Sequence, residues 1–278
     1  MGIRADASRR LLKNKVAITA LCVFILICAA CLMAPYLSKW SYNAINLQRR
    51  RETPSREFWF GTDILGRDLF SRVLYGGRMT LKIAFASTVI AAGAGCLIGF
   101  ITGYFGGRID FLLSRAVDIL ACVPVFLLVI ITEFVLGWGK GHFMYAMAVA
   151  AVPQFARLVR AAAMDISQRQ YIEAARALGV SHFGIIRTHV SRNVAPSLLI
   201  GFTSGVAEAI LTCTIMGYMG IGINPPTPEW GVIIQGGREM MRYHPHVVAI
   251  PCALIILTVA SLSLFSDGLR DAMDPRDV

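Results

Sequence analysis

The stretch VAITALCVFILICAACLMA, residues 16–34, contains 19 residues and no charged side chain. At a helical rise of about 1.5 Å per residue, this length crosses the roughly 30 Å of hydrocarbon in a bilayer. Basic residues precede it, as they precede the apolar core of a signal peptide, but that core is usually about 7 to 15 residues long. We therefore expect a retained membrane-spanning helix, with a cleaved signal as the less favoured alternative.

The composition of the whole chain agrees with a membrane protein. Of the 278 residues, 56% are hydrophobic and 16% are charged, whereas soluble domains are about half apolar and a quarter charged. The formal net charge of +10 would suggest nucleic acid if the basic residues shared one face, but they lie in the gaps between apolar runs. We therefore expect contact with membrane lipid and no nucleic-acid partner.

Further apolar runs predict six membrane-spanning helices and an all-α integral membrane fold. The six runs are 16–34, 83–105, 117–136, 143–156, 195–220 and 247–265. The fourth run is short and contains Pro153, so we place its inner end near Arg157 and Arg160, whose long side chains can reach the interface.

The distribution of Lys and Arg between the loops sets the expected orientation. With the N-terminus inside, the inner segments hold 15 of these residues and the outer segments hold 11, so both termini are expected in the cytoplasm. This orientation divides the chain as follows. The cytoplasmic N-terminus is 1–15, the first span is 16–34, and the extracytoplasmic loop is 35–80. The membrane core is 81–265 with a polar inner segment at 161–195, and the cytoplasmic tail is 266–278.

Three glycines recur every four residues in the second run. Gly95, Gly99 and Gly103 therefore share one stripe of the helix, where the missing side chains allow another backbone to approach closely. Packing within the chain and an interface with another subunit are equally compatible with this stripe.

Three carboxylates lie inside apolar runs, where an ionised group needs a partner or a wet cavity. Asp118 is three residues from Arg115, which predicts an ion pair near the inner end, and Glu133 is near enough to the outer end to reach lipid headgroups. Glu208 is in the middle of its run and is the best candidate for lining a transport path, although a structural hydrogen bond to a neighbouring helix fits equally well. Met216 and Met219 are further path candidates on the same run.

The remaining polar residues give little sign of catalysis or metal binding. His244 and His246 in the last outer loop could contact a soft metal, but two histidines without a third ligand more often belong to a solvated loop. Neither a metalloprotease motif nor a serine nucleophile with its base is present, and no phosphate-binding loop is found. We therefore expect a non-catalytic chain that binds no metal or cofactor and does not itself hydrolyse ATP.

The polar segment at 161–195 is too long for a tight connection. Its residues 170–179, QYIEAARALG, combine strong helix formers with a terminal glycine, which predicts a short helix that ends at Gly179. A second helical piece follows. We expect Ala174, Ala175 and Ala177 on the exposed side of this helix–turn–helix, where small residues favour docking into a groove of another protein.

This segment carries a resemblance to a known family. Glu173, Ala174 and Ala175, with Gly179 after them, resemble the cytoplasmic "EAA" loop of permease subunits in binding-protein-dependent ABC importers. The stretches FGTDILGRDLFSR at 60–72, PPTPEWG at 225–231 and DGLRDAMDPR at 267–276 look like the C-type permease of the peptide/nickel importers. These motifs occur in the family's order from about residue 9 to residue 276.

The resemblance implies a type I ABC importer permease in the cytoplasmic (inner) membrane of a bacterium or archaeon. It implies a translocation pathway shared with a homologous second permease, two cytoplasmic ATPase subunits or domains that bind ATP and Mg, and an extracytoplasmic substrate-binding protein. The helices at 161–195 would then form a coupling loop that seats in clefts of the ATPases.

The substrate is left open among the substrates of such importers. Dipeptides and oligopeptides are expected, with nickel or a nickel chelate as the alternative because of His244 and His246. An ion-coupled secondary transporter that uses Glu208 as its proton site and a purely structural membrane subunit are alternatives from other classes.

Overall fold

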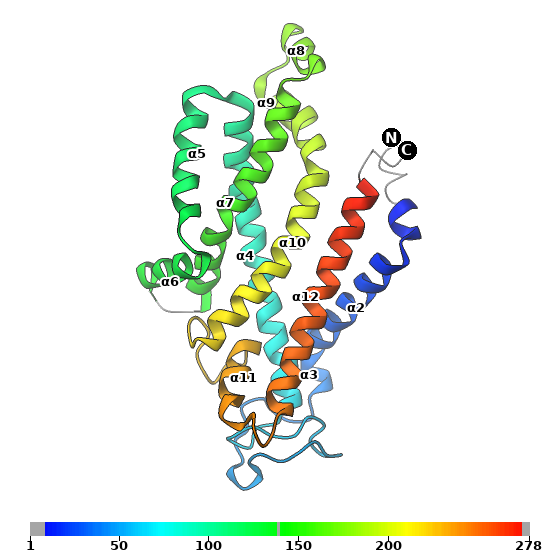
Figure 1. The fold of residues 1–278 in the computed structure, drawn as a ribbon, viewed down its shortest axis with the longest axis vertical. Helices are drawn as coiled ribbons and strands as arrows, with labels where there is room; N and C mark the ends of the chain where they lie inside the picture. Colours follow the sequence, from blue (N-terminus) through cyan, green and yellow to red (C-terminus); the bar gives the residue numbers. More distant parts are fainter. Residues whose placement is uncertain (1–8, 138–139, 274–278) are drawn as a thin grey trace.

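The apolar runs fold into long helices that lie alongside one another in the computed structural model (Figure 1). The structure describes residues 9–137 and 140–273, and within these ranges no strand forms, apart from an isolated bridge between Thr62 and Asp68. The longer helices are α2 (Lys15–Leu32), α4 (Leu69–Phe105), α5 (Gly107–Cys122), α6 (Val125–Leu136), α7 (Lys140–Ser167), α10 (Ser191–Tyr218) and α12 (His246–Met273). The shorter elements are α3 (Ala34–Leu37), η1 (Leu47–Arg49), α8 (Gln170–Ala177), α9 (His182–Ile185), η2 (Ile186–Val190), α11 (Trp230–Gly237) and η3 (Arg238–Met240).

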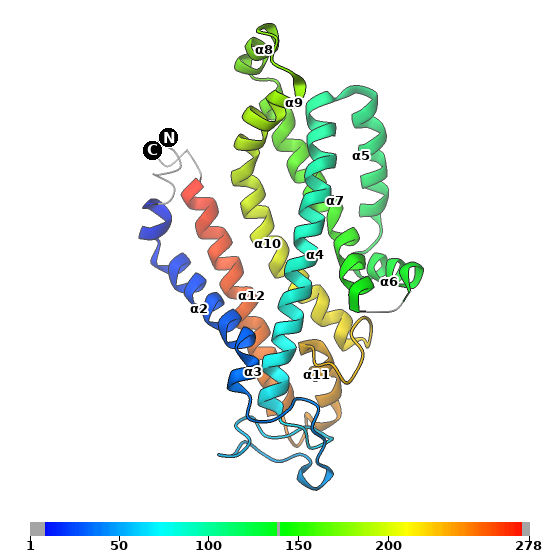
Figure 2. The same ribbon diagram turned by 180° about the vertical axis from the view of Figure 1, so that it is seen from behind.

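The first apolar run forms α2, which is long and apolar enough to cross a membrane. Asn14 caps its start, because the Asn14 side chain accepts a hydrogen bond from the backbone N–H of Ala17 at 3.1 Å. α2 runs beside α12 (Figure 2), and Ala17 packs directly against Gly268. These two small residues let the start of α2 approach the end of α12 closely.

The helix that contains the second apolar run is longer than that run, and it begins within the loop expected at 35–80. α4 begins at Leu69, where the carboxylate of Asp68 accepts a hydrogen bond from the N–H of Ser71 at 2.8 Å. Gly76 and Gly77 lie inside the helix because they make room for α11: a Cβ at Gly77 would lie 2.6 Å from the indole ring of Trp230.

The third apolar run, 117–136, does not form one straight helix. α5 begins at Gly107, ten residues before the predicted start, and it is followed by α6 after a bend of 100°. The break lies at Val123, whose extended backbone (φ −83°, ψ 128°) is the conformation that a following proline imposes. Pro124 therefore turns the chain, and α6 projects to the side of the bundle (Figure 1).

The fourth helix, α7, continues past its predicted inner end. It runs through Pro153, Arg157 and Arg160 to Ser167, so the polar segment begins after residue 167 rather than at 161. The next long helix is continuous from His182 to Tyr218 and contains one wide π-helical turn at Ile186–Val190.

The last helix, α12, also extends further than expected. Residues 266–273 belong to it rather than to a separate tail, and residues 274–278 of the predicted tail lie outside the described part of the chain. Four helical segments of the described chain are long and apolar enough to cross a membrane, and the bent α5–α6 pair counts as a fifth if it is one broken span. α7 is not among them.

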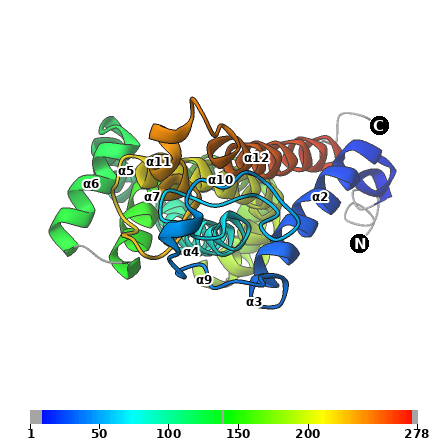
Figure 3. The ribbon, with the colours of Figure 1, turned by 90° about the horizontal axis from the view of Figure 1, so that it is seen from below.

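The elements sort to two ends of the molecule. The start of α2, the end of α12 and the short helices α8 and α9 lie toward one end, whereas α3, α11 and the loop at 38–68 lie at the other (Figures 1 and 2). Viewed from the second end, the loop passes over the end of α4 (Figure 3). The predicted coupling loop and the predicted long outer loop are therefore at opposite ends.

Candidate functional site

The predicted coupling loop forms the short helices α8 and α9 at one tip of the bundle (Figure 1). One face of α8 is buried: Ile172 is fully buried and Ala175 is 8% exposed. Both belong to an apolar cluster with residues from α4, α7 and α10, including Tyr104, Val159 and Val194. α8 is therefore attached to the ends of three long helices.

The opposite face of this segment is exposed. Glu173, Ala174 and Ala177 are exposed, and beyond them Leu178 is 84% and Phe183 is 72% exposed. The sequence-based placement of Ala175 on the exposed side was wrong, because the helical repeat puts it on the same face as Ile172. The free surface therefore combines one acid, two alanines and two large apolar side chains.

Gly179 ends α8 as predicted. Its φ of +78° lies in the left-handed region, the N–H of Gly179 donates to the carbonyl of Arg176, and the N–H of Val180 donates to the carbonyl of Ala175 at 3.1 Å. This pair of hydrogen bonds is the Schellman arrangement that favours glycine. No neighbouring atom lies within 4 Å of a Cβ placed there, so the glycine is required by the backbone conformation alone.

A polar cluster joins the coupling segment to the end of α4. The hydroxyl of Tyr104 lies 2.9 Å from Nδ1 of His182 in α9. Arg176 in α8 lies over the Tyr104 ring, 5.0 Å from its centroid, and its Nε donates to the Tyr104 hydroxyl at 3.4 Å. Tyr104 therefore contacts both short helices, a connection that the sequence alone did not suggest.

Glu208 lines a cavity of about 430 Å³ between α5, α7 and α10. Glu208 is exposed on the surface of the single chain, and its Oε2 accepts a hydrogen bond from Nε2 of Gln154 at 3.1 Å. Glu208 is ten residues from the end of α10, or about 15 Å along the helix. The structure thus shows the hydrogen bond to a neighbouring helix and also the open position that a path residue needs.

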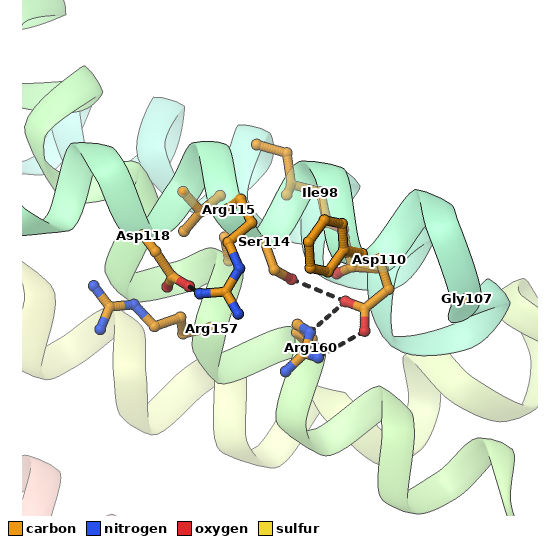
Figure 4. A pocket seen from close by; sticks show the side chains of 12 residues that line it. Ile98, Gly107, Asp110, Ser114, Arg115, Asp118, Arg157 and Arg160 are labelled. Carbon is orange, nitrogen blue, oxygen red and sulfur yellow. Dashed lines mark hydrogen bonds and ion pairs between the residues drawn. The ribbon is translucent and has the colours of Figure 1, made fainter.

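A second cavity, of about 400 Å³, lies beside the first between α4, α5 and α7, and Figure 4 shows its charged lining. Arg160 holds Asp110 through two hydrogen bonds of 2.6 and 2.7 Å, so it pairs within the protein rather than reaching the interface. Arg115 and Asp118 form the predicted ion pair at 3.7 Å. Arg157 lines both cavities.

Two other residues of the apolar runs lie elsewhere than expected. Met216 is fully buried in the main apolar core, so it does not line an open path, whereas Met219 is 53% exposed. Glu133 is also fully buried and does not reach toward lipid headgroups. Burial of these residues depends on tertiary packing, which the apolar runs do not reveal.

The glycine stripe packs within the chain. Gly95, Gly99 and Gly103 all lie against α7, and a Cβ at Gly99 would stand 2.6 Å from Cβ of Val159. Of the two uses that the sequence left open, the structure shows the intrachain one.

His244 and His246 lie edge to face, with ring centroids 5.9 Å apart. Within residues 9–137 and 140–273 no group of three or more His, Cys, Asp or Glu side chains is placed to hold a metal ion. The arrangement of His244 and His246 therefore adds no support to metal contact.

The end that carries α11 contains a buried carboxyl that sequence reasoning did not single out. Glu229 is fully buried; its Oε1 accepts from the Thr80 hydroxyl at 2.8 Å, and its Oε2 accepts from the N–H of Val232 at 3.1 Å. Burial raises the pKa of Glu229 to about 7. Glu229 thus begins α11 and fastens it to α4; its place in the stretch 225–231 was the available signal.

The stretch 60–72 is held by a second carboxylate. Asp63 accepts hydrogen bonds from the N–H groups of Leu65 and Arg67, at 2.8 and 3.0 Å. The same carboxylate pairs with the side chains of Arg67 at 2.7 Å and Arg72 at 3.5 Å. These contacts give the outer loop a defined shape immediately before α4.

The sequence is similar to known transport proteins along nearly its whole length. The chain is 36% identical over 271 residues to the dipeptide transport system permease protein of Alkalihalophilus pseudofirmus, covering 98% of this chain and 89% of that protein. It is 35% identical to the glutathione transport system permease protein of Pectobacterium atrosepticum, covering 96% and 89%. The probable D,D-dipeptide transport system permease protein of Escherichia coli is 34% identical, covering 95% and 88%.

A solved structure shares the fold. An inward-facing structure of the MetNI methionine ABC transporter matches with a TM-score of 0.61 at 21% identity, covering 73% of this chain and 97% of the matched chain. The arrangement of helices is therefore shared with a chain of that ABC transporter.

Two family descriptions match the sequence. Residues 3–54 match the N-terminal TM domain of oligopeptide transport permease C, and residues 95–276 match the binding-protein-dependent transport system inner membrane component. Permeases of this family are non-catalytic membrane subunits that work with an ATPase, which hydrolyses ATP, and with a substrate-binding protein. The chain therefore belongs to the C-type permease subunits of the peptide group of binding-protein-dependent ABC importers.

Proposed function

We propose that this permease carries di- and oligopeptides across the cytoplasmic membrane of a bacterium or archaeon. The observation that carries this proposal is the shared chemistry of the relatives' named substrates, which are a dipeptide, glutathione and a D,D-dipeptide. All three are short peptides, and each relative matches at least 95% of this chain. The proposal therefore favours peptides over nickel.

The proposed topology has six spans with both termini in the cytoplasm. α7 would be the fourth span in chain order: it packs along α4 over the glycine stripe, although its charged residues reduce its hydropathy. The segments would be 1–15 inside, 16–34 in the membrane, 35–80 outside, 81–265 as the membrane core with the coupling loop at 161–195, and 266–278 inside. α8 lies toward the same end of the molecule as the end of α12 and opposite α11, which supports this orientation (Figure 1).

The proposed partners are a homologous second permease, two ATPase subunits or domains that bind ATP and Mg, and an extracytoplasmic binding protein. The exposed side of α8 and α9, with Glu173, Ala174 and Leu178, would dock into an ATPase. Ala175 and Gly179 would act indirectly, one by packing α8 onto the bundle and the other by ending it. Glu208 and the half-exposed Met219 would face the path between the two permeases.

Uptake in a host without its own dipeptide importers tests this function. Cells expressing the complete importer should accumulate a radiolabelled dipeptide, and cells lacking only this chain should not. Excess unlabelled dipeptide should compete, whereas excess Ni²⁺ should not. Uptake should survive a protonophore when ATP is maintained and should cease when the phosphate-binding lysines of the ATPases are replaced. Uptake of nickel alone, or loss of uptake with the proton gradient at full ATP, would contradict the proposal.

A further inference from the structure

The cavity beside Glu208 contains one acid and one base that do not neutralise each other. Glu208 and Arg157 both line it. The carboxylate of Glu208 accepts a hydrogen bond from Gln154, and within the described residues neither an ion pair nor a hydrogen bond holds the guanidinium of Arg157. Charges inside an apolar span are costly unless they meet a partner. Two opposite charges in one cavity therefore suit an occupant that has both a positive and a negative group.

The neighbouring cavity makes an informative contrast. Its acids and bases are matched within the chain, Asp110 with Arg160 and Asp118 with Arg115 (Figure 4). Arg157 is the cation of this face that lacks such a match among the described residues, and it extends into the cavity that contains Glu208. The available positive charge therefore lies on the same side as the available negative charge.

The size and walls of the cavity limit the occupant further. Its volume of about 430 Å³ falls in the range of about 300–1,000 Å³ that is typical of small-molecule sites. Between the charged groups the walls are apolar, with Leu120, Val123, Met147 and Ala150 among them. A small molecule with an uncharged middle and charged ends fits this lining.

The two charged residues meet the cavity from nearby positions on α7 and α10. Gln154, which holds Glu208, and Arg157 are three residues apart on α7, so their Cβ atoms are about 5–6 Å apart on one face. An extended dipeptide spans roughly 7 Å, and the long arginine side chain can adjust to a slightly longer one. A zwitterionic dipeptide or tripeptide can therefore reach both groups at once.

We propose that this cavity binds a zwitterionic short peptide, with Glu208 receiving its terminal ammonium group and Arg157 its terminal carboxylate. Gln154 is a positioning residue that holds Glu208. This proposal rests on the peptide-import function above and adds a recognition step within the permease itself. Binding then depends on both free termini and not on the side chains of the peptide.

Protection of a cysteine in the cavity wall tests the site without the binding protein. Thr212 lines the cavity, so Thr212→Cys would be introduced after the native cysteines are replaced. The importer, purified with its permease partner and ATPases, would be placed in bilayers of phosphatidylcholine and phosphatidylglycerol, which offer no primary ammonium group. The rate of maleimide modification of this cysteine would be measured at increasing concentrations of Ala-Ala, N-acetyl-Ala-Ala or Ala-Ala-amide.

We expect Ala-Ala to slow modification, and each blocked analogue to need at least about tenfold more peptide for the same protection, because each loses one charge-assisted hydrogen bond. Glu208→Gln should remove the preference over N-acetyl-Ala-Ala alone, and Arg157→Gln should remove the preference over Ala-Ala-amide alone. Arg115→Gln, a matched loss of an arginine from the neighbouring cavity, should leave both preferences unchanged.

Several outcomes would overturn the site. Equal protection by all three peptides, or loss of both preferences in each variant, would show that the two charges do not recognise the termini. Protection by phosphatidylethanolamine bilayers without peptide would assign the cavity to a lipid headgroup. Dipeptide uptake measured on the same preparation with its binding protein separates the two proposals: normal uptake without protection rejects this site only, and protection without uptake rejects the import function only.

Discussion

At the scale of single residues, Glu229 shows how one buried carboxyl can join three elements. The backbones of Gly217 in α10 and Gly231 in α11 lie directly against its side chain, and Thr80 in α4 bonds to it. A glutamine has the same shape as the protonated acid, so its amide could donate to Thr80 and accept from Val232. The position therefore needs the shape and the hydrogen bonds but not the negative charge.

Glu229→Gln should change the pH dependence of stability. The pKa of Glu229 is raised from 4.5 to about 7, so between these values the folded chain holds a proton that the unfolded chain has released. The free energy of unfolding of the wild-type protein should therefore fall as the pH rises through this window, by an amount on the order of 3 kcal/mol. In Glu229→Gln this decrease should disappear, and the variant should melt above the wild type at pH 8.

Thermal unfolding of the purified importer from pH 5 to 8 provides the measurement. The exposed Glu239 in η3 provides the control, since Glu239→Gln should retain the wild-type profile. An unchanged pH slope in Glu229→Gln would show that another group titrates in this range.

At the scale of elements, the sequence predicts which segments are helical better than where they begin and end. Apolar runs identify the long helices because a chain buried in lipid or in protein must satisfy its backbone hydrogen bonds within the helix. The ends were missed where tertiary packing outweighs local signals. Gly76 and Gly77 continue α4 because Ile233 packs on the first and Trp230 on the second, and Arg160 continues α7 because Asp110 pairs with it. Proline at 124 was visible, but the 100° bend it produces depends on how α6 packs.

The coupling segment shows the same limit. The helix α8 and its termination at Gly179 follow from local helix propensity and backbone geometry, so they could be predicted. Which face of α8 is free depends on where the three long helices end, and for this reason Ala175 was placed on the wrong side. The cavity around Glu208 and Gln154 joins residues 54 positions apart, and the sequence contains no signal for that contact.

Ala174 and Ala175 form a matched pair for testing this segment. Ala174→Trp, on the exposed face, should leave membrane levels and thermal stability near wild type but weaken ATPase retention or abolish stimulation of ATP hydrolysis by the loaded binding protein. Ala175→Trp, on the buried face, should lower stability by about 1–3 kcal/mol through overpacking. Co-purification of the ATPase and melting of the complex distinguish the two effects. Wild-type coupling in Ala174→Trp would exclude the exposed face from docking.

At the scale of the whole molecule, the two ends differ in shape and in proposed environment. One end carries the short α8–α9 projection near the neighbouring ends of α2 and α12, and the other carries the 38–68 loop and α11 (Figures 1 and 3). If the chain spans the membrane with both termini inside, these ends lie in different compartments, and chemical access from each side should differ.

Cysteine labelling in intact cells, or in spheroplasts where an outer membrane intervenes, tests this orientation. After removal of native cysteines, Ser55→Cys and Tyr243→Cys should react with an impermeant thiol reagent added outside, because both positions are exposed at the end with α11. Glu173→Cys and Arg270→Cys should react only after permeabilisation. Reaction of Glu173→Cys in sealed cells would place the α8 end outside and invert the topology.

The glycine contacts between α4 and α7 also restrict how the molecule can move. Gly95, Gly99 and Gly103 lie directly against α7, so an axial slip of one residue, about 1.5 Å, would move the glycines away from the α7 atoms that they accommodate. Only a displacement of four residues, about 6 Å, would bring glycines back into register. Small movements at the coupling end should therefore turn the α4–α7 pair as one rigid unit, without shear between the two helices.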